Sequence, residues 1–183
     1  CRHASQTVLG EGPQSARLMV VGEQPGDQED IAGRPFIGPA GKLLDQSLAH
    51  AGIERSTTYL TNAVKHFKFT PRGKRRIHSK PNAGEIDQCR WWLNLERKFV
   101  QPEIILAMGA TALRGVLGRA GRLADYRGKA LEIAKGVTLL TTVHPAYLLR
   151  LPDADRRKQE LARFHADLAQ TAMLLEERAR ASG

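Results

Sequence analysis

Short apolar runs alternate with segments of helical periodicity along the chain. Buried strands are predicted where such a run ends in a turn or polar residue, at 17–22, 58–62, 103–109 and 137–143. Helices are predicted where apolar residues recur every three or four positions, at 42–51, 84–100, 110–117 and 155–181. This alternation predicts a parallel sheet with helices on both faces.

The loops that follow the predicted strands are the natural places for a binding site, because ligands bind beyond the carboxyl ends of strands in open α/β sheets. Three of these loops begin with polar side chains, at Glu23, Asn62 and His144. We expect them to converge on one site. The segment 130–134 is a candidate for one more short strand, ahead of the turn at 135–136.

The first of these loops lies within the segment from Gly22 to Asp45 (GEQPGDQEDIAGRPFIGPAGKLLD). Its glycines and prolines force a tight path, which lets the backbone approach a ligand closely. From composition alone, an ordinary acidic surface loop explains it equally well. No Gly-Lys-Ser/Thr follows at the right spacing, so it is not a Walker-type phosphate loop.

Charge and composition narrow the classes of partner. The 183 residues include 28 Lys and Arg against 19 Asp and Glu, an excess that favours nucleic acid or an anionic membrane surface. The densest basic segment is 65–80 (KHFKFTPRGKRRIHSK). Such a run is usually a solvated face, but aromatic and aliphatic residues interrupt this one. We therefore expect it to contact a phosphate backbone.

Other compositional features argue against membrane-bound and secreted classes. No apolar run approaches the roughly 20 residues of a membrane span, and the basic-then-apolar order of a signal peptide is missing. Two cysteines, Cys1 and Cys89, are too few for a disulfide framework and fit a reduced compartment or a metal site. We expect a soluble cytoplasmic monomer with one domain over residues 1–183.

Four segments together resemble the motifs of the uracil-DNA glycosylase superfamily, in the form shared by family 4 and the UdgX class. They are 22–45, 61–65 (TNAVK), 109–112 (GATA) and 144–150 (HPAYLLR). The resemblance covers nearly the whole chain, in the same motif order. It implies a three-layer α/β/α fold with a four-stranded, mainly parallel sheet, and excision of uracil from single- or double-stranded DNA.

The resemblance also implies roles for residues that would hold the flipped base. Phe36 would stack on uracil and Asn62 would bond its Watson–Crick edge, with Gln24 and Asp27 in the same pocket. The alternative for Phe36 is core packing. His144 would contact the base or the negative charge that develops at its O2, although a His-Pro pair also makes a plain turn.

Other residues would contact DNA outside the base pocket. By the same resemblance, Leu148 would enter the minor groove and fill the space left by the base, with Arg150 beside it. Lys74, Arg75 and Arg76 would bind the phosphate backbone.

The pentapeptide 74–78 (KRRIH) resembles the segment that separates UdgX-type proteins from hydrolytic family 4 enzymes. This likeness implies that His78 captures the sugar cation in place of water and leaves a covalent adduct. Glu23 would stabilise that cation, or orient or deprotonate His78. The alternatives are a phosphate-contacting His78, a conventional family 4 enzyme that turns over, and a non-catalytic DNA-binding protein.

Family 4 enzymes carry a four-iron four-sulfur cluster on four cysteines. The resemblance implies that Cys1, His66 and Cys89 occupy ligand positions, with His66 where family 4 has a cysteine. One cysteine of the N-terminal pair has no counterpart, and we expect it in a short piece missing from this chain. The alternative is two unrelated buried thiols.

Overall fold

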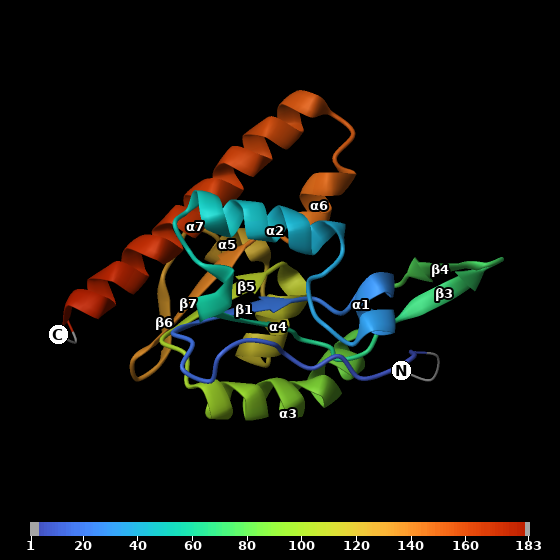
Figure 1. Ribbon diagram of the computed structural model, residues 1–183, viewed down its shortest axis with the longest axis horizontal. Coiled ribbons are helices and arrows are strands. Elements are labelled where there is room, and N and C mark those ends of the chain that lie inside the picture. The colour runs from blue at the N-terminus through green and yellow to red at the C-terminus, as the bar shows by residue number, and fades with distance from the viewer. Residues whose placement is uncertain (1–3, 182–183) are drawn as a thin grey trace.

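A five-stranded sheet forms the centre of the molecule (Figure 1). The computed structural model describes residues 4–181. The strands run in the order β2 (Thr58–Asn62), β1 (Leu18–Gly22), β5 (Ile104–Met108), β7 (Val137–Thr142) and β6 (Leu131–Ala134). The first four are parallel, whereas β6 is antiparallel to β7. Strands β1, β2 and β5 are buried throughout, as their apolar runs predict.

Helices cover both faces of this sheet. They are α1 (Asp27–Ala32), α2 (Pro39–His50), α3 (Ala83–Val100), α4 (Ala110–Leu117), α5 (Leu123–Tyr126), α6 (Pro145–Arg150) and α7 (Ala154–Ala181), with a 3-10 turn η1 at Arg55–Thr57. In Figure 1, α2, α6 and α7 lie above the sheet and α3 lies below it. None of the described helices combines the length and the apolar character that a membrane span requires.

Alternate residues of β1 divide between two hydrophobic cores, because successive side chains of a strand point to opposite faces. Leu18 and Val20 pack with apolar residues of α2, α6 and α7. Met19 and Val21 pack with those of α3 and α4. The predicted three-layer α/β/α arrangement is confirmed, and the two cores hold the strands rigidly.

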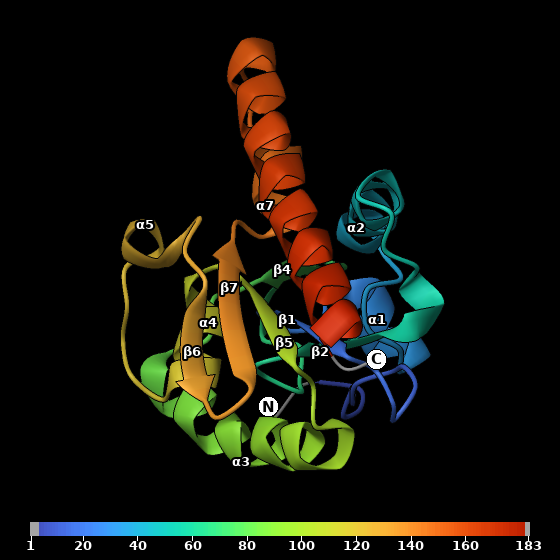
Figure 2. The same ribbon diagram turned by 90° about the vertical axis from the view of Figure 1, so that its left-hand side faces the viewer.

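The predicted strand count of four is wrong by one. The fifth strand, β6, lies at the edge of the sheet beside β7 (Figure 2) and is mostly exposed. An exposed edge strand does not need the continuous apolar run that marks the buried ones. Its position agrees with the candidate strand at 130–134.

The basic segment is not a plain loop. Strands β3 (Phe69–Arg72) and β4 (Arg75–His78) pair as an antiparallel hairpin, separate from the main sheet. Gly73 turns the chain between them with a φ of 60°, which favours glycine. The hairpin projects beyond α1 (Figure 1), so its tip stands clear of the two cores.

Candidate active site

A cavity of about 420 Å³ opens at the carboxyl ends of the parallel strands. The loops that follow β1 and β7 line it together with Asn62, the last residue of β2, so Glu23, Asn62 and His144 converge as predicted. The end of β4 supplies a fourth side. The predicted site residues that line it are Glu23, Gln24, Asp27, Phe36, Asn62, His78, His144 and Arg150.

Glu23, directly after β1, carries the anionic group of the cavity. Its Oε1 lies 3.0 Å from His78 Nε2, and its Oε2 accepts a hydrogen bond of 2.8 Å from Thr111 Oγ1. Burial alone would raise its pKa, but the hydrogen bonds from His78 and Thr111 outweigh burial, and the pKa is lowered. Glu23 is therefore a carboxylate at neutral pH. Thr111, in the first turn of α4, was given no role on the basis of the sequence.

Asn62, the last residue of β2, presents an amide in which one atom lacks a partner. The side chain is 2% exposed, and its buried Oδ1 makes no hydrogen bond within the described residues. Such a group costs free energy until a donor arrives. At Gly22, a Cβ would lie 2.4 Å from Asn62 Oδ1 and 2.6 Å from Phe36 Cζ. Glycine there lets the amide and the ring approach each other.

Phe36 lines the cavity and also belongs to the core, so its packing in the core leaves part of the ring facing the cavity. Its ring centroid lies 6.3 Å from that of His144, with 26° between the planes. The backbone of Phe36 has a φ of 56°, a left-handed conformation that a bulky residue rarely adopts. Strain of this kind concentrates at functional sites.

A buried ion pair supports the end of β2 behind Asn62. Lys65 Nζ donates to Glu96 Oε2 (2.6 Å), to Thr61 Oγ1 (2.6 Å) and to the Asn62 backbone carbonyl (2.8 Å). The Lys65 side chain is completely buried. This corrects the expectation that the whole basic segment faces a phosphate backbone, since its first residue is part of the interior. The sequence did contain one sign of this pairing: Glu96 is an acidic residue on the apolar face of helix α3.

His144 caps the N-terminus of α6, where its Nδ1 accepts a hydrogen bond from the Ala146 backbone N–H (3.2 Å). Burial lowers the pKa of His144 to about 4, although Glu23 opposes the shift. The imidazole is therefore neutral at neutral pH. Because Nδ1 accepts, Nε2 carries the proton and is free to act as a donor.

Arg76 fixes the hairpin to α1. Its guanidinium pairs with Asp27 Oδ1 (2.5 Å) and Asp30 Oδ2 (2.6 Å), and it lies 5.4 Å and 5.2 Å from the ring centroids of Phe67 and Phe69. These internal contacts correct the expectation that Arg76 binds DNA phosphates. The ion pair with Arg76 also occupies the carboxylate of Asp27, which was expected to lie in the pocket for the flipped uracil.

Gln24 fixes the base of the same hairpin. Its Nε2 donates to the backbone carbonyls of Lys68 (3.1 Å) and Ser79 (3.2 Å), and its Oε1 accepts from the Lys68 N–H. The amide expected to contact uracil is therefore used within the protein. Together, Gln24 and Arg76 hold His78 beside Glu23.

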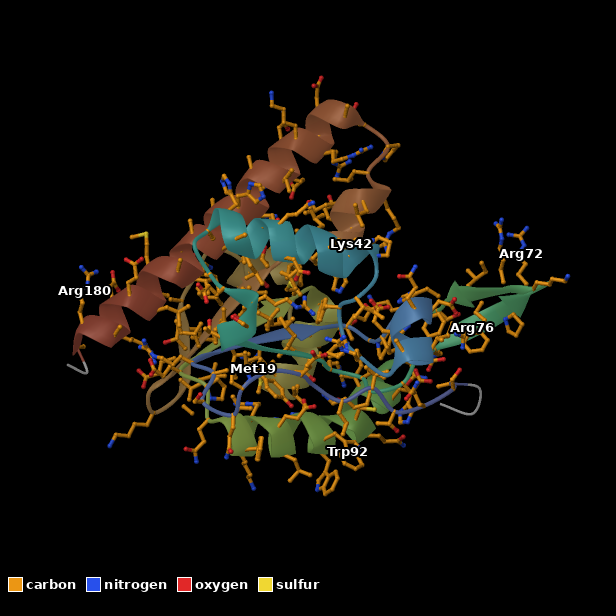
Figure 3. All side chains as sticks on the ribbon, in the orientation of Figure 1. Met19, Lys42, Arg72, Arg76, Trp92 and Arg180 are labelled. Carbon is orange, nitrogen blue, oxygen red and sulfur yellow. The ribbon has the colours of Figure 1, made fainter. Side chains whose placement is uncertain are left out.

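The remaining residues expected at DNA divide into exposed and buried ones. Lys74 and Arg75 are exposed near the hairpin tip, next to Arg72 (Figure 3). The expected wedge, Leu148, is 1% exposed and belongs to the core, whereas Leu149 is 48% exposed and lines the cavity. Successive residues of α6 point in different directions, so Leu149 and not Leu148 is the leucine that a ligand of the cavity could contact.

Two of the expected cluster ligands lie in the described part of the chain. Cys89 is a buried free thiol, and His66 has a buried Nδ1 without a hydrogen-bond partner there, while its Nε2 contacts Thr7 Oγ1. Cys1 lies outside the described residues. Residues 4–181 contain no group of three or more potential metal ligands. Of the three expected ligands, the described residues therefore include His66 and Cys89.

Comparison with known proteins agrees with this geometry. Residues 9–169 match the family model of the uracil DNA glycosylase superfamily. A type-4 uracil-DNA glycosylase of Thermotoga maritima is 37% identical, over 88% of this chain and 80% of the relative. A type-4 uracil-DNA glycosylase of Pyrobaculum aerophilum is also 37% identical, over 82% and 77%. The chain belongs to the uracil-DNA glycosylase superfamily.

Proposed function

We propose that this protein excises uracil from DNA by hydrolysis, as a conventional type-4 enzyme. The observation that carries the proposal is the partnerless Oδ1 of Asn62 in a cavity that also holds Phe36 and Glu23. Uracil N3–H is a donor that satisfies Oδ1, and uracil O4 accepts from the amide nitrogen. Cytosine presents the opposite pattern, so the amide rejects it by leaving buried groups unpaired.

The polar groups of the cavity fit the charges that develop as the glycosidic bond breaks. The electron pair of the N1–C1′ bond leaves with uracil, and His144 Nε2–H stabilises the anion at O2. The Glu23 carboxylate stabilises the cation on the sugar. A water oxygen then bonds to C1′, and its proton passes to Glu23. Thr111 orients the carboxylate throughout.

A second candidate is a UdgX-type outcome, in which His78 captures the sugar. The observation that favours it is the 3.0 Å contact between His78 Nε2 and Glu23 Oε1, together with the place of His78 in the cavity lining. Glu23 would take the Nε2 proton, and the freed lone pair would bond to C1′ in place of water. The type-4 relatives favour hydrolysis, so this outcome ranks second.

One experiment separates these outcomes. The protein is incubated with a single-stranded or duplex oligonucleotide that contains one uracil, and the products are run on a denaturing gel. Free uracil and an abasic strand support hydrolysis. A protein–DNA band that survives denaturation and disappears in His78→Ser supports capture. If the protein releases no base and binds DNA with steep salt dependence whether or not uracil is present, it is a non-catalytic DNA-binding protein.

We also propose that His66 and Cys89 belong to the ligand set of an iron–sulfur cluster. The unpartnered Nδ1 of His66 and the free thiol of Cys89 support this proposal. Iron, acid-labile sulfide and visible absorbance of the purified protein test it. Loss of these signals in Cys89→Ser is the expected result, and a folded wild-type protein without iron overturns the proposal.

A further inference from the structure

Helix α3 carries apolar side chains on two opposite faces. Ile86, Leu93 and Val100 point into the protein and are buried. On the other side lie four large apolar residues that are 40–59% exposed: Trp91, Trp92, Leu95 and Phe99. At about 3.6 residues per turn, these four form one continuous stripe. Trp92 points away from the body on α3, the outermost layer (Figure 3).

A groove of about 690 Å³ runs beside this stripe. Apolar groups of Trp91, Leu95 and Val137 form part of its lining. Three cations line it as well: Arg97, Lys98 and Lys135. Contiguous exposed apolar surface of this kind marks an interaction site more often than isolated exposed side chains do.

The charges of the groove are not balanced within the protein. No ion pair is found for Arg97, Lys98 or Lys135 across residues 4–181. Arg97 bonds only weakly to Asn94 Oδ1 (3.4 Å) and the Val116 carbonyl (3.3 Å), and its pKa is lowered by burial and by the nearby Arg90. An incoming carboxylate would relieve this unfavourable position of the guanidinium.

The carboxylate nearest this groove is already occupied. Glu103 lines the groove, but Arg17 binds both of its oxygens at 2.8 Å. The surface therefore presents aromatic and aliphatic groups next to uncompensated positive charge. Its electrostatic complement is an apolar stripe with acidic residues beside it.

We infer that the stripe and groove form a docking surface for an acidic amphipathic helix of a partner protein. The helix would lay its apolar face against Trp91, Leu95 and Val137, the apolar side chains that line the groove. Its carboxylates would reach Arg97 and Lys98, which line the same groove. The groove lies at the start of β5 and β7, at the opposite end of the sheet from the active-site cavity. The partner therefore binds while the active site holds DNA.

Two other occupants fit the surface less well. A second copy of this chain has a net charge of +9 and would bring the same cations together. Single-stranded nucleic acid needs aromatic faces open for stacking. The Trp91 and Trp92 rings instead meet edge to face, at 80° and 4.7 Å, and Leu95 continues the stripe as an aliphatic side chain.

Tryptophan fluorescence tests the proposal directly, because the only two tryptophans of the chain are Trp91 and Trp92. The probe is a synthetic amphipathic helical peptide with leucines on one face and glutamates beside them. The expected result is a saturable, salt-sensitive change in emission. A peptide in which lysines replace the glutamates should bind at least about tenfold more weakly, a difference of about 1.4 kcal/mol.

Matched variants of the protein locate the contact. Lys98→Glu should weaken peptide binding about tenfold and leave uracil excision unchanged, whereas Lys158→Glu, on exposed α7, should leave peptide binding unchanged. The absence of a saturable change overturns the inference. So do tighter binding of oligothymidylate than of the acidic peptide, and a concentration-dependent dimer that Leu95→Asp abolishes. Uracil excision is measured separately, so its failure would not affect this inference.

Discussion

The two walls of the active-site cavity are held by different physical means. The core wall comprises Asn62 at the end of β2, His144 just after β7, and Phe36, whose ring belongs to the hydrophobic core. The hairpin wall is His78 on β4. Asn62 is 2% exposed, whereas the side chain of His78 is 48% exposed. Burial across two hydrophobic cores fixes the first wall, and a few polar contacts fix the second.

Under the proposed function, this difference separates recognition of the base from the fate of the sugar. The core wall cannot shift without disturbing strands that both cores hold, so under that proposal a rigid template would read the base. The hairpin has few apolar contacts with the cores and can open locally at low cost in free energy. Glu23 contacts Thr111 of α4 through one carboxylate oxygen and His78 of the hairpin wall through the other. Changes in the hairpin should therefore alter the chemistry after bond cleavage while base recognition persists.

The largest expected effect comes from breaking the support of the core wall. In Lys65→Met, the carboxylate of Glu96 stays buried without its cation, and the free energy of unfolding should fall by about 3–5 kcal/mol. Denaturant unfolding measures it, with Lys42→Met as the exposed control. A double variant, Lys65→Met with Glu96→Leu, should recover part of the loss because no charge is left buried. An unchanged denaturant midpoint in Lys65→Met would show that the Lys65–Glu96 ion pair does not stabilise the core wall.

Two neighbouring leucines of α6 give the next largest effect and separate packing from DNA contact. Leu148→Ala removes a buried side chain and should cost about 2–5 kcal/mol of stability. Leu149→Ala should change stability by less than about 0.5 kcal/mol, since Leu149 is half exposed. Leu149→Ala should instead slow excision from duplex DNA more than from single strands. Equal excision from both substrates argues against the wedge.

The contrast between the walls also explains what the sequence could predict. Strands β1, β2, β5 and β7 follow from uninterrupted apolar runs, and their ends predict the loops that build the core wall. The hairpin has no such pattern, because exposed cations and Pro71 replace the usual alternation. Its fold depends on Arg76 meeting Asp27 and Asp30 of α1, which are distant in sequence.

The direction of individual side chains was the second feature that the sequence could not predict. A pattern places Leu148 and Leu149 on one short helix but does not decide which of them faces the core. Lys65 stands in a run of basic residues that mostly face solvent, and only its pairing with Glu96 shows that it is interior. Many of the motif residues line one cavity, whereas contacts between elements decide which side chains remain available to a ligand.

Releasing the hairpin wall should have a smaller effect on stability. Arg76→Gln leaves the buried carboxylate of Asp30 without its cation and should lower stability by about 1–3 kcal/mol. Cleavage by trypsin at the hairpin tip should become faster, and any reaction of His78 with the sugar should decline more than uracil release. The control is Arg75→Gln, on the exposed side of the same strand. If the two variants show the same stability and the same rate of trypsin cleavage, Arg76 does not fix the hairpin to α1.

The smallest expected effect is the part of the pH dependence of stability that His144 of the core wall contributes. His144 has a pKa of about 4 in the folded protein and an ordinary value of 6.5 when unfolded. Below pH 6.5 the unfolded chain takes up a proton that the folded protein refuses, so stability falls as the pH drops toward 4. Between pH 6.5 and 5.5 the loss is at most about 1.4 kcal/mol. Asparagine also caps helices, so His144→Asn should keep α6 and flatten this dependence in urea unfolding. If wild type and variant lose stability in parallel, His144 is not the neutral donor of the core wall.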